Sequence, residues 1–435
     1  MFLTYQYRLY PLRSQLPLLE HALSELTLLW NHALSERQDA WRKERRRIAY
    51  LEQQSALKRW RNFDSWGLGR LPYNAARDCL QRLDLAYRAA FRRQRQGSRR
   101  PGFPRFRRLT QSMTFPPRSP PLVVGRAGTY RLRVPRLGEL PVRLHRPPPS
   151  GGVPKSVTVS HEADGAWCAS IVYELPEPPR PPDVAPMAAV GVDLGLRPLA
   201  TLSTGVRVGA PKFLAAAERR IAQAQRRLSR KKRGSHRYER QRLRLARLHA
   251  KVRRQRRWFA HQLSHDIAER YDLVAFEDLD SRQFSECNPL AKWLQDAGWG
   301  MLRRMARYKL ALRSKVILLV PTAGTTQTCS ACGRLASPRL SLRDRIYRCP
   351  CGYVGDRDLN AARNILDRGL ALRFEELRRR TAEETRVESG PPPDPRRGRR
   401  AYSRNRELTV QWVIIEFPEP KWLEGLSGIF PLPNS

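Results

Sequence analysis

The sequence is short of acidic residues: 40 Asp and Glu stand against 82 Lys and Arg, which leaves a formal net charge of +42 on 435 residues. A solvated surface with no charged partner normally mixes both signs and stays near neutrality. The imbalance argues against that case. It predicts a protein that neutralises many phosphates and whose binding weakens steeply as the salt concentration rises.

Long apolar runs are also missing. No stretch approaches the ~20 apolar residues that a membrane span needs, and Arg8, Pro11 and Arg13 interrupt the first residues too early for a signal peptide. We therefore expect a cytosolic protein with no membrane partner. Since 41% of the residues are hydrophobic, the length suits two or three domains with real cores.

Cysteine is scarce, with seven residues, and four of them fall within residues 329 to 351. This clustering favours metal binding over a disulfide framework. Cys329 and Cys332 form a Cys-x2-Cys knuckle, whereas only one residue separates Cys349 from Cys351. Four thiolates suit tetrahedral zinc and leave no position open for a substrate, so the predicted zinc is structural. Free cysteines in a metal-free ribbon are the alternative, because the second gap is one residue shorter than usual. The other three cysteines are interpreted as core or surface residues: Cys79, Cys168 and Cys287.

The first two fifths of the chain alternate between helical and strand patterns. Residues 3–9 show the alternation of a half-buried strand, and residues 14–34 and 72–95 repeat apolar side chains every three or four positions. Short alternating runs between residues 103 and 175 predict strands of a small β-barrel or sandwich. The Pro-rich residues 176–186 predict a stiff linker and a domain boundary.

Acidic residues stand at strand ends and a helix start in the remainder of the chain. Asp193 lies in an apolar strand, where a charge is costly unless it is paired or binds metal. Glu277 closes a second buried strand, and Asp358 precedes a helical pattern. Three acids in such places fit a two-metal phosphodiesterase. Asp278 is interpreted as a turn acid, and Asp356 as a surface or turn acid that stays an alternative to Asp358.

A long helical pattern covers residues 213–270 and breaks near residue 233. Between residues 219 and 257 it carries 18 Lys or Arg and one Glu, which favours a phosphate-contacting helix pair over a merely solvated helix face. The candidate nucleic-acid contacts are Arg226, Arg227, Arg230, Lys231, Lys232, Arg233, Arg253 and Arg254.

Several motifs occur together in one order: "GVDLGLRPLATLSTG", "VAFEDLD", "DAGWGMLRRM", "TTQTCSACG" and "YRCPCGYVGDRDLNAARNIL", with "YRLYPLRSQ", "PGFPRF" and "VRLHRP" nearer the start. From about residue 3 to residue 370 the chain resembles the transposon-encoded TnpB (OrfB) family, which is related to type V CRISPR effectors. The resemblance implies a multidomain α/β plus α+β protein. Its expected parts are a β-barrel wedge domain (1–10 and 103–180), a helical recognition domain (11–102), an RNase H-like RuvC nuclease domain (181–325 and 354–380) and a zinc-ribbon insertion (326–353).

The resemblance also implies an activity, which is RNA-guided cleavage of double-stranded DNA next to a short motif, with a guide RNA made from the protein's own element. Carried over by motif, the catalytic acids are Asp193, Glu277 and Asp358, with Asp193 bridging two Mg²⁺ ions and Mn²⁺ as a substitute. The four clustered cysteines would hold the structural zinc. A monomer is favoured.

Three other functions stay open from the sequence. One is a compact CRISPR effector whose guide comes from an array. Another is an RNA-guided DNA-binding regulator that no longer cuts, which the three intact acids disfavour. A transposase that joins strands itself has the least support, because no tyrosine or serine recombinase motif is present. The basic, Pro-rich tail (381–435) has no assigned role; one of its segments reads as a strand that could add to the barrel edge.

Overall fold

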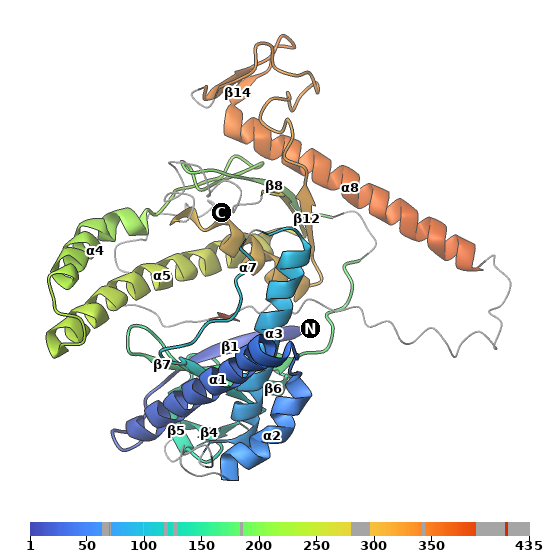
Figure 1. Cartoon of the computed structure of the whole chain (residues 1–435). Helices are drawn as coiled ribbons and strands as arrows, with labels where there is room; N and C mark the ends of the chain where they lie inside the picture. Colours follow the sequence, from blue (N-terminus) through green and yellow to red (C-terminus); the bar gives the residue numbers. More distant parts are fainter. Residues whose placement is uncertain are drawn as a thin grey trace. The chain divides into compact units, whose positions relative to one another are not determined.

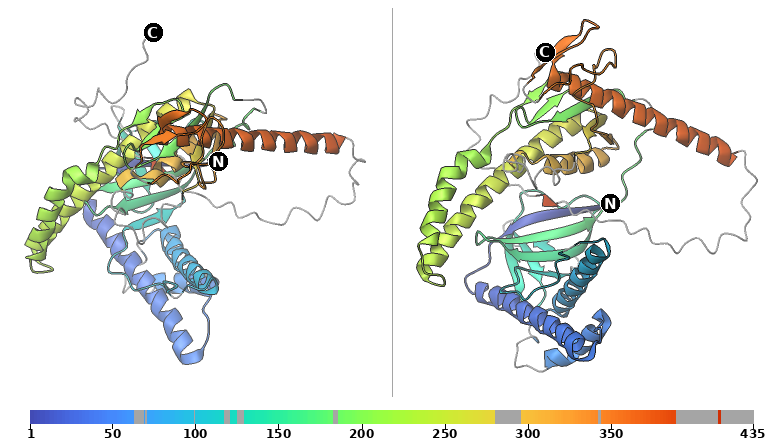
Figure 2. Two further views of the ribbon diagram at one scale, coloured as in Figure 1. Left: turned by 90° about the horizontal axis from the view of Figure 1, so that it is seen from above. Right: turned by 45° about the horizontal axis from the view of Figure 1, so that its top comes forward.

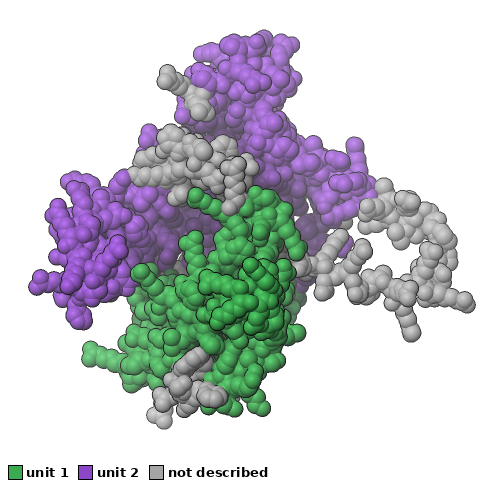
Figure 3. All heavy atoms as spheres, viewed as in Figure 1, with its two compact units in different colours: residues 1–176, 412–418 green, residues 177–411, 419–435 purple. Residues whose placement is uncertain are grey.

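In the computed structural model the chain divides into two compact units, one of residues 1–176 with 412–418 and one of residues 177–411 with 419–435 (Figure 3). The boundary falls at the start of the Pro-rich stretch. The structure describes residues 1–62, 69, 71–98, 100–116, 121–124, 129–182, 186–279, 296–341, 344–388 and 414–415. Cys287 and most of the tail lie outside these residues.

The first unit is built on an antiparallel sheet in the order β2-β6-β7-β1-β5-β4-β3. Its strands are β1 (Phe2–Leu9), β2 (Ser112–Phe115), β3 (Leu122–Val124), β4 (Tyr130–Val134), β5 (Gly138–Arg143), β6 (Val153–His161) and β7 (Trp167–Glu174). Strand β15 (Ile414–Ile415), from the tail, pairs in parallel with β1. A piece of the otherwise unassigned tail is thus a strand of this sheet.

Three helices complete the first unit: α1 (Leu16–Glu44), α2 (Tyr50–Asn62) and α3 (Tyr73–Arg95) (Figure 1). The apolar faces of α1 and α3 join the core of the sheet. Cys79 donates to the carbonyl of Leu26, and Arg37 contacts Asp84 at 3.2 Å, so α1 and α3 run in the same direction. Helix α2 was not predicted, because only two of its described side chains are buried and its sequence shows little apolar periodicity.

The second unit contains a five-stranded sheet in the order β10-β9-β8-β11-β12. Its strands are β8 (Ala189–Leu194), β9 (Ala200–Leu202), β10 (Arg207–Val208), β11 (Leu273–Glu277) and β12 (Val316–Val320). Strands β10, β9 and β8 are antiparallel, whereas β8, β11 and β12 are parallel. The parallel strands therefore end at one edge of the sheet.

Helices α5 (His236–Arg270) and α7 (Trp299–Ala311) cover one face of this sheet and α8 (Arg357–Glu388) covers the other, while α4 (Phe213–Ser229) packs on α5. Val192 and Phe276 pack on the face that shares a core with α5 and α7. Gly191 points to the opposite face, where a Cβ atom would lie 2.1 Å from the carbonyl oxygen of Ala362 in α8. Only glycine at residue 191 allows α8 to lie this close to β8.

One detail of the helices differs from the prediction. Helix α8 begins at Arg357, so Asp358 lies inside its first turn and not ahead of it. The motif "DAGWGMLRRM" leads into α7, and residues 280–295, which precede it, lie outside the described residues. Over the ranges given above, we find no helix with the length and apolarity to cross a bilayer.

Candidate active site and metal centre

Asp193 and Glu277 stand side by side at the carboxyl ends of two parallel strands. The β8–β11 register pairs Val192 with Phe276, so the next residue on each strand is one of the two acids. Because side chains alternate along a strand, both acids point to the face that carries Gly191 and α8. Asp193 is 9% exposed and Glu277 7% exposed. Two carboxylates are thus buried at one sheet edge.

The third acid, Asp358, reaches the same place from the first turn of α8. The pKa of Asp193 is raised from 3.8 to about 8, first by burial and then by the negative charges of Glu277 and Asp358, while Arg357 lowers it. Like charges this close make one another's ionised forms unfavourable. The fold therefore brings together the three acids that the sequence singled out, although they are far apart along the chain.

Side chains that the sequence reading missed hold the end of β11. Burial raises the pKa of Glu277, and a hydrogen bond from the Thr325 hydroxyl opposes the rise. Arg303, from α7, donates to the carbonyls of Glu277 at 2.9 Å and Leu279 at 2.6 Å. The only sequence signal for Arg303 was its position in the "DAGWGMLRRM" motif. Together these contacts fix both the backbone and the carboxylate of Glu277.

The two neighbouring acids have other partners. Asp356 accepts a hydrogen bond from the backbone N–H of Leu359 at 2.9 Å, which caps α8, and it pairs with Arg207 at 2.8 Å. Asp278 is 66% exposed at its side chain and lies 3.5 Å from Arg303. Asp358 makes longer contacts, 3.4 Å to Arg357 and 3.6 Å to Arg345. The carboxylate of Asp358 is therefore held less firmly than that of Asp356.

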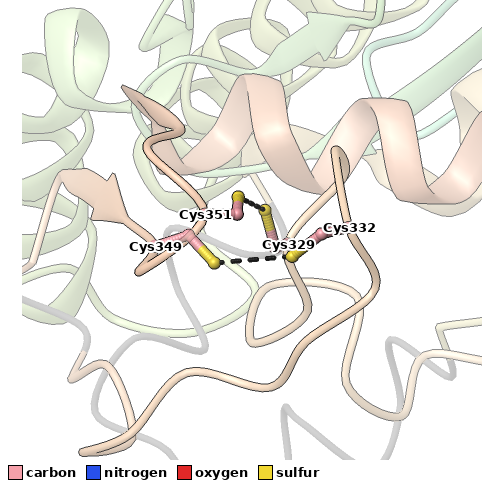
Figure 4. Close-up of side chains that lie close together, drawn as sticks. All are labelled: Cys329, Cys332, Cys349 and Cys351. Atoms are coloured by element: carbon pink, nitrogen blue, oxygen red, sulfur yellow. Dashed lines mark hydrogen bonds between the residues drawn. The ribbon is translucent and has the colours of Figure 1, made fainter.

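The four cysteines converge between strand β12 and helix α8 (Figure 4). The Sγ–Sγ distances are 3.8 Å for Cys329 and Cys351 and 3.6 Å for Cys332 and Cys349. A tetrahedral zinc ion with ~2.3 Å Zn–S bonds sets its sulfurs about 3.8 Å apart, so this donor set fits zinc. The short gap between Cys349 and Cys351 is accommodated because Gly352, at φ +92°, closes a turn by donating to the carbonyl of Cys349.

Within the described ranges, these cysteines are the one group of three or more His, Cys, Asp or Glu residues whose ligand atoms all lie within 4.8 Å of one another. The three carboxylates are spread more widely. Two cations in a phosphodiesterase site lie ~3.5–4 Å apart, and ligands of different cations need not touch. The two donor sets therefore suit different metals.

Helix α8 connects the two sites. The ribbon hairpin of β13 (Ile346–Arg348) and β14 (Val354–Asp356) leads directly into this helix. Asn360 is fully buried; its side chain accepts from the N–H of Ser330 at 2.8 Å and donates to the carbonyl of Thr328 at 2.7 Å. Because Asp358 lies two residues earlier, the cysteine knuckle and the third acid share one rigid support.

The eight predicted nucleic-acid contacts lie on a helical hairpin formed by α4 and α5 (Figure 2), and all eight side chains are exposed. A further row of arginines lines a hollow along α5: Arg237, Arg240, Arg244 and Arg247. Their spacing of three and four residues places them on one helix face. At the base of the hairpin, Asp296 contacts Arg256 at 2.6 Å and accepts from the N–H of Leu214 at 3.2 Å. The hairpin is thus a basic projection with an anchored base.

Comparison with known proteins gives matches along most of the chain. Residues 170–288 match the OrfB_IS605 family, described as "Probable transposase", residues 299–365 match the "Cas12f1-like, TNB domain", and residues 1–46 match HTH_OrfB_IS605, described as "Helix-turn-helix domain". A "Putative RNA-guided DNA endonuclease" of Streptomyces pristinaespiralis is 34% identical over 370 residues, covering 84% of this chain and 89% of the relative.

A second relative and a solved structure are also similar to this chain. The "Putative RNA-guided DNA endonuclease InsQ" of Escherichia coli K12 is 30% identical over 362 residues, covering 79% of this chain and 86% of that protein. Among solved structures, the protein in the Cas12f1-sgRNA-target DNA complex superposes with a TM-score of 0.51 at 14% identity, over 81% of this chain and 83% of that one. At this identity the structural match shows a common fold and nothing more specific.

Proposed function

The chain belongs to the TnpB (OrfB) family, and from this membership and the buried acids we propose that it is an RNA-guided endonuclease that cuts double-stranded DNA. Its guide would be an RNA from its own element, and its target would lie next to a short recognised motif. Two relatives of nearly full length carry the name RNA-guided DNA endonuclease. The charge of +42 suits a protein that grips nucleic-acid backbones regardless of sequence.

We assign the second unit to an RNase H-like RuvC nuclease domain with a zinc-ribbon insertion. Three antiparallel strands followed by two parallel ones, with helices on both faces, support this assignment. The first unit would comprise the wedge barrel (1–10 and 103–180) and the helical recognition domain (11–102).

The observation that carries the proposal is the convergence of three acids, two of them buried at one sheet edge and the third, Asp358, in the first turn of α8. Burial first, and then the negative charges of Glu277 and Asp358, raise the pKa of Asp193, and a bound cation would neutralise those charges. These three side chains would hold two Mg²⁺ ions, with Mn²⁺ as a substitute. When bound, such ions activate a water molecule and stabilise the leaving oxygen of the phosphodiester.

The chain's own residues would prepare the site. Asp193 must release its proton before it can act as a ligand, so cation binding and proton release are linked. Thr325 and Arg303 keep the Glu277 carboxylate at the strand end. Arg357, beside Asp193 and Asp358, reduces the repulsion between them.

The zinc site would be structural. Cys329, Cys332, Cys349 and Cys351 would occupy all four positions of the ion and leave none for a substrate. Its role would be to hold the ribbon against Asn360, and so to fix the start of α8 and the position of Asp358.

The test is cleavage by protein purified with its co-expressed RNA, after that RNA has been sequenced. A duplex matching the guide should be cut in Mg²⁺. Asp193→Asn should abolish cutting while DNA binding persists, and Asp278→Asn should cut like the wild type. If Asp358→Asn cut normally and Asp356→Asn did not, the assignment of the third acid would be wrong.

A further inference from the structure

The ends of α1 and α3 carry large aromatic side chains at the surface. Trp41 is 45% exposed, Phe91 40% and Phe103 41%, and Arg45 and Arg47 accompany them. We call these five residues the aromatic–arginine surface. Rings of this size normally bury most of their area, so an exposed group of them indicates a binding surface.

The side chains of this surface form one connected cluster. Phe91 and Phe103 meet edge to face, with their ring centroids 5.4 Å apart. The guanidinium carbon of Arg47 lies 5.8 Å from the ring centre of Trp41 and 5.9 Å from that of Phe91, and that of Arg45 lies 5.6 Å from Trp41. Arg47 thus joins Trp41 of α1 to Phe91 of α3.

The local fold builds this cluster. Because α1 and α3 run in the same direction, Trp41 and Phe91 both lie in the last turns of their helices. Arg93 of α3 donates to the carbonyls of Pro101 at 2.6 Å and Gly102 at 3.2 Å. These hydrogen bonds hold the segment after α3 against the helix, so that Phe103 contacts Phe91. Arg45 ends α1 in the left-handed conformation at φ 51°, where the chain reverses.

The surroundings determine which ligand fits. Residues 42–47 read "RKERRR", five basic residues and one acid, and α3 ends with three arginines in its last turn. An apolar protein partner would have to leave this charge uncompensated, whereas a nucleic acid supplies phosphates for the cations and bases for the rings. Paired bases stay stacked in their own helix, so the bases must be unpaired.

We propose that the aromatic–arginine surface stacks unpaired nucleobases of the guide RNA. This inference rests on the proposed function. RNA is chosen over DNA because the RNA offers unpaired bases from the moment the complex forms, whereas target DNA offers them only after its duplex has been opened. The surface would hold part of the RNA in place before any target is met.

The experiment uses the full-length protein and a single-stranded oligoadenylate RNA that contains 2-aminopurine, whose fluorescence falls when it stacks. Binding is measured at ~0.5 M salt, where phosphate contacts are largely screened. Trp41→Leu and Phe91→Leu should each weaken single-strand binding by about 5- to 100-fold and abolish the quenching. Arg47→Gln, which keeps the rings, should weaken binding and reduce its salt dependence.

Controls separate stacking from charge and from misfolding. Tyr10→Leu, at an aromatic side chain that is 51% exposed and outside the cluster, should bind like the wild type. An RNA duplex of equal length should bind Trp41→Leu within about twofold of the wild type, because its bases are not available. Unchanged thermal unfolding of the variants shows that they fold.

Three results would overturn the inference: single-strand binding and quenching that survive in Trp41→Leu and Phe91→Leu, an equal loss for the duplex, or stacking seen with single-stranded DNA and not with RNA. None of these results bears on the proposed function, which is tested by guided cleavage with the wild-type protein. If the wild-type protein bound no RNA at all, the proposed function and the further inference would both be wrong.

Discussion

Removing the charge of Asp193 should stabilise the metal-free protein while it abolishes cleavage. The folded chain keeps this side chain 9% exposed, and its pKa is raised from 3.8 to about 8, first by burial and then by the charges of Glu277 and Asp358. Folding therefore favours the protonated acid, whereas the unfolded chain ionises it above pH 4. Asn cannot ionise, so Asp193→Asn removes this conflict.

The magnitude follows from the separation of the two pKa values. The folded state binds more protons than the unfolded state, so stability is unaffected below pH 4 and falls as the pH rises towards 8. At pH 7 the difference is about three pH units, which corresponds to a cost of up to about 4 kcal/mol. Asp193→Asn should raise the free energy of unfolding of the second unit by up to this amount. For a unit of this size the corresponding rise in Tm is about 10 °C.

The assay is thermal or denaturant unfolding at pH 5, 6 and 7 in buffer that contains no Mg²⁺ and a small excess of Zn²⁺, so that the zinc is retained. The gain should be largest at pH 7 and should shrink steadily as the pH falls towards 4. Asp278→Asn, at an exposed carboxylate one residue beyond Glu277, is the matched control and should change stability by less than about 0.5 kcal/mol. A variant that is no more stable than the wild type at pH 7, or a gain independent of pH, would refute the reasoning.

Other substitutions test the supports of the site. Gly191→Ala places a Cβ atom 2.1 Å from the Ala362 carbonyl oxygen and should lower the free energy of unfolding, measured by chemical denaturation, by about 3 kcal/mol or more. Gly209→Ala, whose Cβ atom would have nothing within 4 Å, should be nearly neutral. Equal effects of the two substitutions would contradict the close approach of α8 to β8. Cys329→Ser should lower bound zinc, measured by metal analysis, from one ion per chain to well below one, and a wild type without zinc would rule out the metal site. Arg303→Met removes two hydrogen bonds to the end of β11 and should lower kcat about 10-fold or more with DNA affinity unchanged. A normal kcat would show that Glu277 needs no support from Arg303.

The sequence alone predicts the elements that depend on local patterns. Alternation over residues 3–9 and the apolar run before Glu277 gave strands that match β1 and β11, and the break near residue 233 separates α4 from α5. Motif order was sufficient to recognise the family. Helix α2 was not predicted, because a surface helix with only two buried side chains shows no apolar periodicity in its sequence.

Other features depended on contacts between distant segments, which no local pattern records. The sequence singled out Asp193, Glu277 and Asp358 from their neighbours, but only the parallel register of β8 and β11 and the approach of α8 over Gly191 bring them together. The same holds for Arg303, which reaches the end of β11 from another helix.

The choice between two aspartates shows the division most clearly. In the sequence, the family motif assigned the third acid to Asp358, and Asp356 stayed an alternative to it. In the folded chain Asp356 caps α8 and pairs with Arg207, while the charge of Asp358 raises the pKa of Asp193 more than the charge of Asp356 does. The sequence by itself determined which residue types were available at the site. The tertiary structure decided their partners, because burial and charge act through space and not along the chain.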